Sequence, residues 1–202
     1  MFEREPITVG ELMDKQFLPK PVIVEGMLPA GTYILAGTLK IGKSFLMTQL
    51  CWSVAEGIPF LGLTTRKTTV LYLALEDTQE RLQSRLARMF GADWSGSEFH
   101  PLFQINQQGD ALIQQFQDFI LAHPDTRLIV IDTLQRVRES DGASYSYSYD
   151  YEIIMPLKTF ADAYDIALIV VHHTRKNEGD DNLFNQISGT NGLRLFRARV
   201  WQ

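Results

Sequence analysis

Short apolar segments alternate with segments of helical periodicity along this chain. The apolar segments are TYILAG (32–37), TTVLYLALED (68–77), RLIVIDT (127–133) and IALIVV (166–171). Residues 43–57, 78–91, 110–124 and 150–165 have helical spacing, and Pro156 within the last segment predicts a kink or a late start. Strands that are apolar on both faces are typical of parallel sheets covered by helices. We therefore predict an α/β fold with a mostly parallel, twisted sheet flanked by helices.

Weaker patterns surround these segments. TVGELMDK (8–15) predicts a short helix, PVIVEGML (21–28) an extended piece, and PLFQIN (101–106) a weaker strand. The 202 residues lack a linker-like break or a repeat, so we expect one domain. We divide it into an extension (1–30), a core (31–193) and an atypical tail (194–202).

Composition narrows the class of protein. The net charge of −5 argues against a surface coated in basic residues, although positive charge can still gather locally. The single cysteine, Cys51, excludes an intramolecular disulfide and fits a reducing compartment. The charged start does not resemble a secretory signal, and no apolar run approaches the roughly 20 residues of a membrane span. These features predict a cytoplasmic protein that does not enter a membrane.

The segment GTLKIGKS (37–44) matches the pattern G-x-x-x-x-G-K-[ST] between a predicted strand and a predicted helix. Its glycines let backbone N–H groups surround phosphate oxygens, and the helix N-terminus adds partial positive charge. Lys43 is expected to reach the β and γ phosphates, and Ser44 to bind Mg²⁺. The expected nucleotide-binding residues of this loop are Gly37, Thr38, Leu39, Lys40, Ile41, Gly42, Lys43, Ser44 and Phe45.

Acidic residues end two of the predicted strands. Asp132 follows LIVI and is expected to hold Mg²⁺ through water, the alternative being a cap for the following loop. Glu76 and Asp77 end the LALED segment, where one carboxylate could polarise an attacking water and the other cap the next helix. We assign the catalytic role to Glu76 and the cap to Asp77 or Thr78.

The chain resembles the RecA-like P-loop ATPases, and within them the RepA-type group of plasmid and phage replication proteins. EGMLPAGTYILAGTLKIGKSFL, VLYLALEDTQERLQSRL, LIVIDTLQRVR, IVVHHTRK and ISGTNGL carry the resemblance, from about residue 24 to 193. It implies ATP and Mg²⁺ as ligands and a homo-oligomeric, hexameric ring. It also implies that IALIVV lies between the phosphate-loop strand and the Asp132 strand, so that HHTRK emerges beside the γ-phosphate.

Within this resemblance, His173 looks like the γ-phosphate sensor, with His172 as a second nucleotide contact. Two histidines hydrogen-bonded at a strand end are the plainer alternative. A zinc site is disfavoured because no cysteine or acid pair stands at ligand spacing around them. Arg81 and Arg85 share one face of a predicted helix; they contact the nucleotide or form surface salt bridges.

The resemblance places polynucleotide contacts, and single-stranded DNA as a partner, in the loop 174–192. That loop carries mixed charge, so its composition alone gives a weak DNA-binding signal; its charged residues include Arg175, Lys176, Glu178, Asp180 and Asp181. The tyrosines of SYSYSYDY (144–151) would share one side if extended and could stack on bases. We favour a plain surface loop for that segment.

The end of the chain departs from the family pattern. GTNGL is followed by RLFRARVWQ, with three arginines in six residues, where family members continue into further strands. We therefore expect a truncation or a disturbed reading frame near Arg194. Arg197 or Arg199 is a weak candidate for the arginine that activates a neighbour's nucleotide.

Three functions remain open from the sequence. The first is a Mg²⁺-dependent ATPase that acts on DNA in replication or repair, as a helicase or loader-type motor. The second is a nucleotide-gated regulator that hydrolyses ATP poorly. The third, a P-loop kinase of a small molecule, is disfavoured by the combination of LALED and HHTRK.

Overall fold

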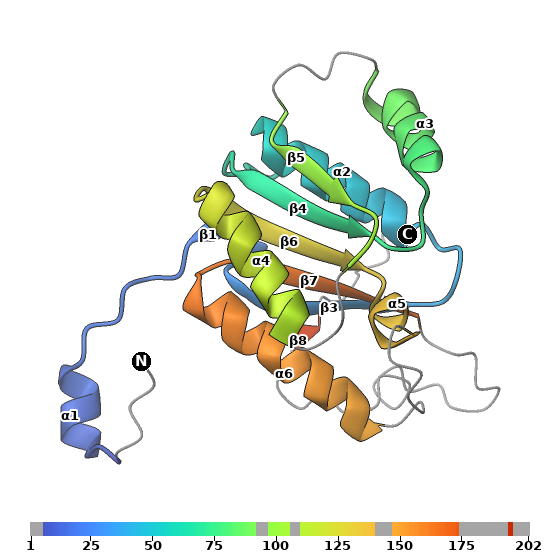
Figure 1. Cartoon of the computed structure of the whole chain (residues 1–202). Coiled ribbons are helices and arrows are strands. Elements are labelled where there is room, and N and C mark those ends of the chain that lie inside the picture. The colour runs from blue at the N-terminus through green and yellow to red at the C-terminus, as the bar shows by residue number, and fades with distance from the viewer. Residues whose placement is uncertain (1–5, 92–96, 106–109, 140–146, 174–193, 196–202) are drawn as a thin grey trace.

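A six-stranded sheet forms the centre of the protein (Figure 1). The computed structural model describes residues 6–91, 97–105, 110–139, 147–173 and 194–195. The strand order is β5-β4-β6-β7-β3-β8 and every pairing in this sheet is parallel. The strands are β3 (Gly31–Gly37), β4 (Thr69–Ala74), β5 (Phe99–Leu102), β6 (Thr126–Asp132), β7 (Ala167–His173) and β8 (Arg194–Leu195). The prediction of an α/β fold with a parallel sheet is confirmed.

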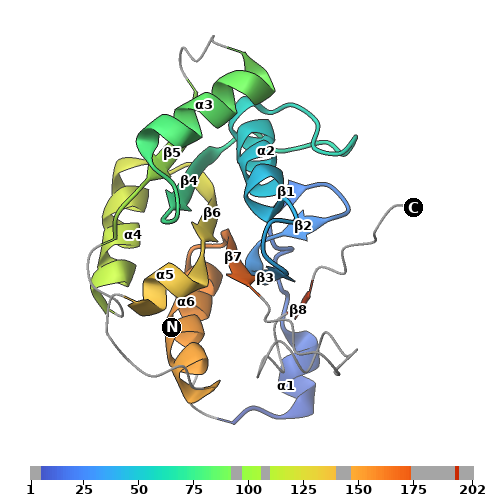
Figure 2. The same cartoon turned by 90° about the vertical axis from the view of Figure 1, so that its right-hand side faces the viewer.

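Helices cover both faces of this sheet (Figures 1 and 2). They are α2 (Lys43–Glu56), α3 (Gln79–Phe90), α4 (Asp110–Ala122), α5 (Leu134–Glu139) and α6 (Tyr147–Ala163). One buried cluster joins α2 to one face of the sheet, and a second joins α4, α5 and α6 to the other. The central strands are buried on both faces, which explains why their sequences are continuously apolar. No helix among the described residues is long and apolar enough to span a membrane.

Strand β7 lies between β3 and β6, as the family resemblance implies. Its seven residues pair in register with β3, from Gly31↔Ala167 to Gly37↔His173. On its other side Ile131 pairs with Val170. Because parallel strands end at the same edge of a sheet, this order brings the loop after β3 next to the two histidines.

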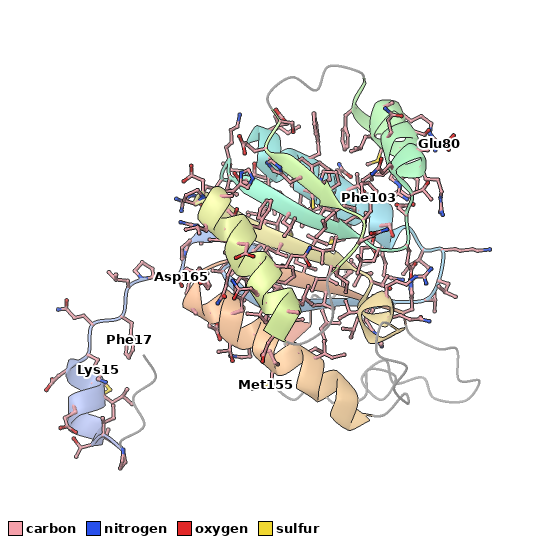
Figure 3. The ribbon with its side chains drawn as sticks, viewed as in Figure 1. Lys15, Phe17, Glu80, Phe103, Met155 and Asp165 are labelled. Carbon is pink, nitrogen blue, oxygen red and sulfur yellow. The ribbon has the colours of Figure 1, made fainter. Side chains whose placement is uncertain are left out.

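The N-terminal segment stands apart from the sheet (Figure 1). Helix α1 (Val9–Asp14) begins with a capping box, in which Thr8 and Glu11 satisfy each other's backbone N–H groups. None of the residues of α1 is buried, and Figure 3 shows Lys15 and Phe17 away from the body of the protein. The strands β1 (Val22–Val24) and β2 (Leu28–Pro29) then form a small antiparallel pair.

Two predicted segments differ from the structure. Helix α6 begins at Tyr147, so the prediction of a plain loop over 144–151 is wrong from that residue onwards. Pro156 lies inside α6, which excludes the late start. A helix that buries Ile154, Leu157 and Phe160 extends easily toward its N-terminus, because adding a turn costs less than starting one.

Strand β5 begins and ends earlier than the predicted 101–106. It pairs on one side only, with Val70 opposite Phe99. Pro101 lacks an N–H group, and an edge strand tolerates this because one side of it needs no partner. The strand signal in the sequence was weak because its residues are only partly buried.

Two leucines of α4 differ in how far they are exposed to solvent. Leu112 is 2% exposed and Leu121 is 83% exposed. We expect Leu112→Ala to lower the free energy of unfolding by about 2–5 kcal/mol, because it leaves a cavity in the core. The control, Leu121→Ala, should change it by less than about 0.5 kcal/mol. Urea denaturation measures both values, and equal losses would contradict the position of α4 against the sheet.

Candidate functional site

The loop between β3 and α2 is shaped for close backbone approach. Lys40 and Gly42 have φ values of 64° and 89°, in the left-handed region. A Cβ on Gly37 would lie 2.5 Å from Cδ1 of Ile41, the end of a side chain that can rotate away. Leu39, Lys40 and Ile41 are exposed along the outer side of the loop. Their backbone follows the course that the phosphate-loop pattern predicts, from a buried strand into the N-terminus of a helix.

Lys43 is the buried cation of this loop. It is 6% exposed, and its Nζ donates hydrogen bonds to the carbonyl oxygens of Gly37 and Thr38 at 2.9 and 2.8 Å. Burial lowers the pKa of Lys43, while the nearby carboxylates of Asp132 and Glu76 act in the opposite direction. The ammonium group is therefore held over the mouth of the loop, where a phosphate chain would meet it.

Asp132 ends β6 as a buried carboxylate. It is 3% exposed and accepts a hydrogen bond of 2.7 Å at Oδ2 from the hydroxyl of Tyr72 on β4. Its Oδ1 is buried without a direct hydrogen-bond partner among the described residues. Burial raises the pKa of Asp132, and interactions with Tyr72 and with Ser44 oppose this change. A buried carboxylate oxygen beside a serine hydroxyl is the oxygen set that Mg²⁺ and its bound water prefer.

Glu76 lies two residues beyond the end of β4 and is fixed from two sides. Its Oε1 accepts a hydrogen bond of 2.8 Å from Thr133, and its Oε2 lies 3.5 Å from Nε2 of His173. Its side chain is 39% exposed. The structure thus brings an oriented, water-accessible carboxylate to the edge of the sheet where Lys43 and Asp132 also lie.

His172 and His173 end β7 opposite Ala36 and Gly37 of β3. The His173 side chain is 16% exposed, and its Nδ1 is buried without a partner among the described residues. Among the described residues, His173 therefore has a neighbour for only one of its ring nitrogens, the Nε2 that faces Glu76. It lies between the phosphate loop and Glu76, the position that the resemblance implies.

Helix α3 has a defined N-terminal cap, and two of its arginines form ion pairs. Thr78, rather than Asp77, caps the helix by accepting a hydrogen bond from the N–H of Arg81. Asp77 lies 2.7 Å from Arg85 and 3.5 Å from Arg81. The guanidinium of Arg85 also lies over the ring of Phe45, 4.9 Å from its centroid. Phe45 thus connects the first turn of α2 to α3, and Arg85 forms a buried ion pair.

Two residues of this site were not predicted from the sequence. Tyr72 and Thr133 orient Asp132 and Glu76, and both are fully buried. A buried tyrosine in an apolar strand needs a hydrogen-bond partner, so Tyr72 carried a signal, but its partner depends on strand order. The residues of the predicted polynucleotide loop, the 144–146 part of the tyrosine segment and the tail arginines Arg197 and Arg199 lie outside the described residues.

Tyr72→Phe tests the support of Asp132. Losing this hydrogen bond should lower the free energy of unfolding at neutral pH by about 1–3 kcal/mol, because a buried carboxylate oxygen loses its donor. The bond favours the ionised carboxylate, so its contribution should disappear as the pH falls through the pKa of Asp132. Tyr33→Phe, which removes a bond to a neutral carbonyl oxygen, is the control. Equal losses with equal pH dependence would show that Tyr72 does not support a charge.

Comparisons with known proteins agree with this geometry. A family model described as an AAA domain matches residues 2–179. A KaiC-like protein of the hyperthermophilic archaeon Pyrococcus horikoshii OT3 superposes with a TM-score of 0.57 and 18% identity, over 77% of this chain and 67% of that one. A structure of a DnaB-like replicative helicase and its interactions with primase superposes with a TM-score of 0.59 and 14% identity, over 86% of this chain.

The chain spans 50% of the length of that helicase. At these identities the two structures establish the fold alone. No curated protein sequence matches the chain. The family match over most of the chain shows that this protein belongs to the AAA-domain family of P-loop ATPases, and the structures show that it has a RecA-like P-loop fold.

Proposed function

We propose that this protein binds ATP with Mg²⁺, hydrolyses the terminal phosphoanhydride bond, and couples that reaction to single-stranded DNA as a RepA-type motor or loader. The observation that carries the proposal is the meeting of a P-loop lysine and two carboxylates. Lys43, Asp132 and Glu76 come from three elements, yet they lie close enough for both acids to influence the pKa of the lysine. A cationic side chain and two carboxylates beside one loop suit phosphoryl transfer, in which positioning and charge stabilisation dominate catalysis.

The phosphate loop and Lys43 would bind the phosphates of ATP. Nζ of Lys43 would exchange its carbonyl partners, Gly37 and Thr38, for phosphate oxygens. The hydroxyl of Ser44 and, through water, the carboxylate of Asp132 would hold Mg²⁺. When bound, this ion neutralises charge on the phosphate oxygens. Tyr72 keeps the Asp132 carboxylate pointed at that position.

Glu76 is our candidate for the general base. Thr133 holds one of its oxygens, and the other faces His173 and solvent. A carboxylate held in this way can accept a proton from a water molecule aimed at the γ-phosphate. His173 is within reach of Glu76, so a change at the phosphate can be passed to the residues that follow β7. His172 stays a predicted second contact.

Two roles were predicted for Arg81 and Arg85 of α3, contact with the nucleotide and formation of salt bridges, and we assign one role to each residue. Arg85 is 8% exposed and engaged by Asp77 and Phe45, so we assign it to holding α3 against α2. Arg81 has a side chain that is 67% exposed. Its ion pair with Asp77 is longer, at 3.5 Å, and an exposed pair of this kind is weak. Arg81 is the better candidate for contact with a bound nucleotide.

The DNA-linked part of the proposal rests on likeness. The DnaB-like protein is a replicative helicase, and the RepA-type resemblance covers LALED and HHTRK, the two segments whose residues meet at Glu76 and His173. We further propose a homo-oligomeric ring, which sedimentation in the presence of Mg²⁺ and ATP would reveal as a nucleotide-dependent multiple of the 23.0 kDa chain.

Nucleotide binding and hydrolysis should separate in two variants. Lys43→Ala should abolish both, because it removes the cation that binds the phosphates. Glu76→Gln should keep ATP binding and lower kcat by about 10²–10⁴-fold, the range expected when a general base is removed. Steady-state phosphate release and equilibrium binding of a fluorescent ATP analogue measure the two properties.

Glu80→Gln provides the matched control for Glu76→Gln. Glu80 is an exposed residue of α3, labelled in Figure 3, and its substitution removes the same charge a short distance along the chain. It should leave kcat unchanged. If the wild-type chain binds ATP but releases no phosphate, the protein is a nucleotide-gated regulator and the proposal of an ATPase is wrong.

Single-stranded DNA should raise the steady-state rate of ATP hydrolysis. The stimulation should weaken as salt rises, because phosphate contacts release counterions. His173→Gln keeps a hydrogen-bond donor at this position, and it should retain more of the stimulation than His173→Ala. A rate that DNA leaves unchanged at low salt would refute the DNA-coupled function while leaving ATP hydrolysis intact.

A further inference from the structure

A second group of side chains with metal-binding chemistry lies at the end of the sheet where the parallel strands begin, opposite the end that carries the phosphate loop. Glu98 directly precedes β5, His100 lies within β5, and His123 directly follows α4. We propose that these three residues bind one transition-metal ion of the zinc class. The proposal is independent of the ATPase function, since none of the three residues belongs to the nucleotide site.

The distances suit a single ion. One ligand atom from each residue can be chosen so that all three lie within 4.8 Å of one another. Nε2 of His100 lies 3.4 Å from Oε2 of Glu98. With metal–ligand bonds of about 2.0–2.1 Å, two ligands of a tetrahedral zinc ion are separated by about 3.3–3.4 Å. This pair therefore already has the spacing of one edge of a zinc tetrahedron.

Backbone hydrogen bonds anchor all three residues, by strand pairing at Glu98 and His100 and by a turn at His123. The carbonyl oxygen of Glu98 accepts a hydrogen bond of 2.9 Å from Val70, and His100 pairs in register with Leu71. The carbonyl oxygen of His123 accepts bonds from the backbone N–H and the hydroxyl of Thr126. The site thus joins the start of β5 to the turn that follows α4 and leads into β6.

The side chains are also oriented. The hydroxyl of Thr69, a residue that is 4% exposed, donates a hydrogen bond of 2.9 Å to Oε2 of Glu98. This bond, followed by the one with His100, lowers the pKa of Glu98 and keeps it an anionic ligand. A buried hydroxyl that holds a carboxylate is the usual outer support of a metal ligand.

The two imidazoles are packed together. Their ring centroids are 4.4 Å apart, and the ring of Phe119 contacts His100 at 5.5 Å and His123 at 4.6 Å. The two imidazoles and Phe119 thus form one packed group of rings beside Glu98, which limits the rotation of both imidazoles.

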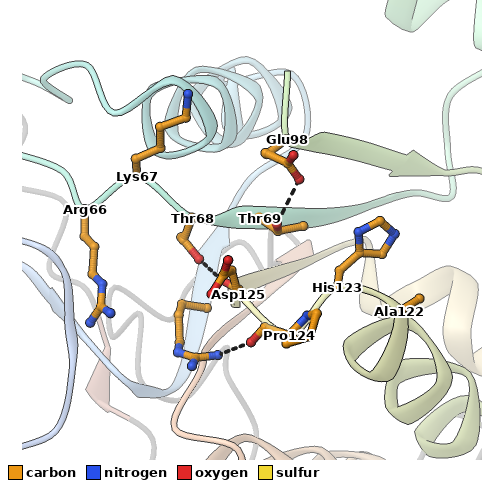
Figure 4. A pocket seen from close by; sticks show the side chains of 10 residues that line it. Arg66, Lys67, Thr68, Thr69, Glu98, Ala122, His123, Pro124 and Asp125 are labelled. Atoms are coloured by element: carbon orange, nitrogen blue, oxygen red, sulfur yellow. Dashed lines mark hydrogen bonds between the residues drawn. The ribbon is translucent and has the colours of Figure 1, made fainter. Parts of the chain in front are cut away.

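The ligand set selects the class of ion. Two imidazoles and one carboxylate suit zinc and its neighbours in the first transition row, while Mg²⁺ and Ca²⁺ prefer oxygen alone. Three protein ligands leave a coordination position for water. Glu98 and His123 line a pocket of about 430 Å³ through which water can reach the ion (Figure 4). The site is distinct from the ATP site, because the seven residues of β6 separate the two edges by about 20 Å.

The four histidines of the chain allow a matched test. The full chain, freed of metal by a chelator and kept in excess Mg²⁺ without nucleotide, is titrated with Zn²⁺ by calorimetry. We expect one strong site, lost in the double variant His100→Gln/His123→Gln and kept in His172→Gln/His173→Gln. Co²⁺ in place of Zn²⁺ should give the visible absorption of a four- or five-coordinate site. A strong site lost only in the second double variant would overturn the proposal.

Two further variants guard against a fold defect. Glu98→Gln changes a side chain that is 46% exposed, so the chain should fold normally but bind Zn²⁺ at least about 100-fold more weakly. Thr69→Val keeps the shape of the buried residue and should weaken binding by about 10–100-fold, as loss of an outer support does. Circular dichroism without metal confirms the fold. Zn²⁺ binding that both variants leave unchanged would show that the cluster is an ordinary ion pair.

Discussion

Parallel pairing of β7 with both β3 and β6 fixes which residues meet at the nucleotide site. The register places Gly37 opposite His173, and Ala74 of β4 opposite Asp132 of β6. A slip of one residue would exchange the two faces of a strand and would move His173 away from its place opposite Gly37. The contacts between elements, from Tyr72 to Asp132 and from Glu76 to Thr133 and His173, depend on this register because the residues lie at or near the same end of neighbouring strands.

The site holds buried charges that the fold must support. Lys43 and Asp132 are both nearly inaccessible to solvent, and burial disfavours the charged form of each. Each has polar support: carbonyl oxygens for the lysine, and the Tyr72 hydroxyl for the aspartate. An isolated buried charge would be far more costly than one with hydrogen bonds and an opposite charge nearby. The arrangement holds the charges in position before a ligand arrives, which is what catalysis of phosphoryl transfer requires.

Local patterns in the sequence predicted most of the fold. Continuous apolar runs identified β3, β4, β6 and β7, because strands buried on both faces show no polar alternation. The GTLKIGKS pattern located the phosphate loop, because its chemistry lies within eight consecutive residues. The inserted position of β7 came from resemblance to a family, since periodicity carries no information on strand order. The edge strand β5 was misplaced because its residues are only partly buried, and the start of α6 was misplaced because the alternating sequence SYSYSYDY has no helical periodicity.

Contacts between distant residues could not be predicted in the same way. The bond from Tyr72 to Asp132 spans 60 positions and the bond from Thr133 to Glu76 spans 57. No cysteine or acid pair stands at ligand spacing around His172 and His173, whereas Glu98 and His100 are two residues apart at the start of β5. Their third partner, His123, reaches them only because α4 ends beside the first residues of β5, and that requires the folded structure.

The two ends of the sheet, where the parallel strands begin and where they terminate, differ in what stabilises them. At the end of the sheet where the parallel strands terminate, hydrogen bonds hold the charged groups Lys43, Asp132 and Glu76 in position. At the end where the strands begin, the proposed metal site involves β5. This strand pairs on one side only and is partly buried, whereas all six residues of β4 are buried. Hydrophobic burial therefore stabilises β5 less than its neighbour. A metal ion shared by Glu98, His100 and His123 would join this exposed strand to the end of α4. It would stabilise the strand whose burial is weakest, at the end of the sheet opposite the nucleotide site.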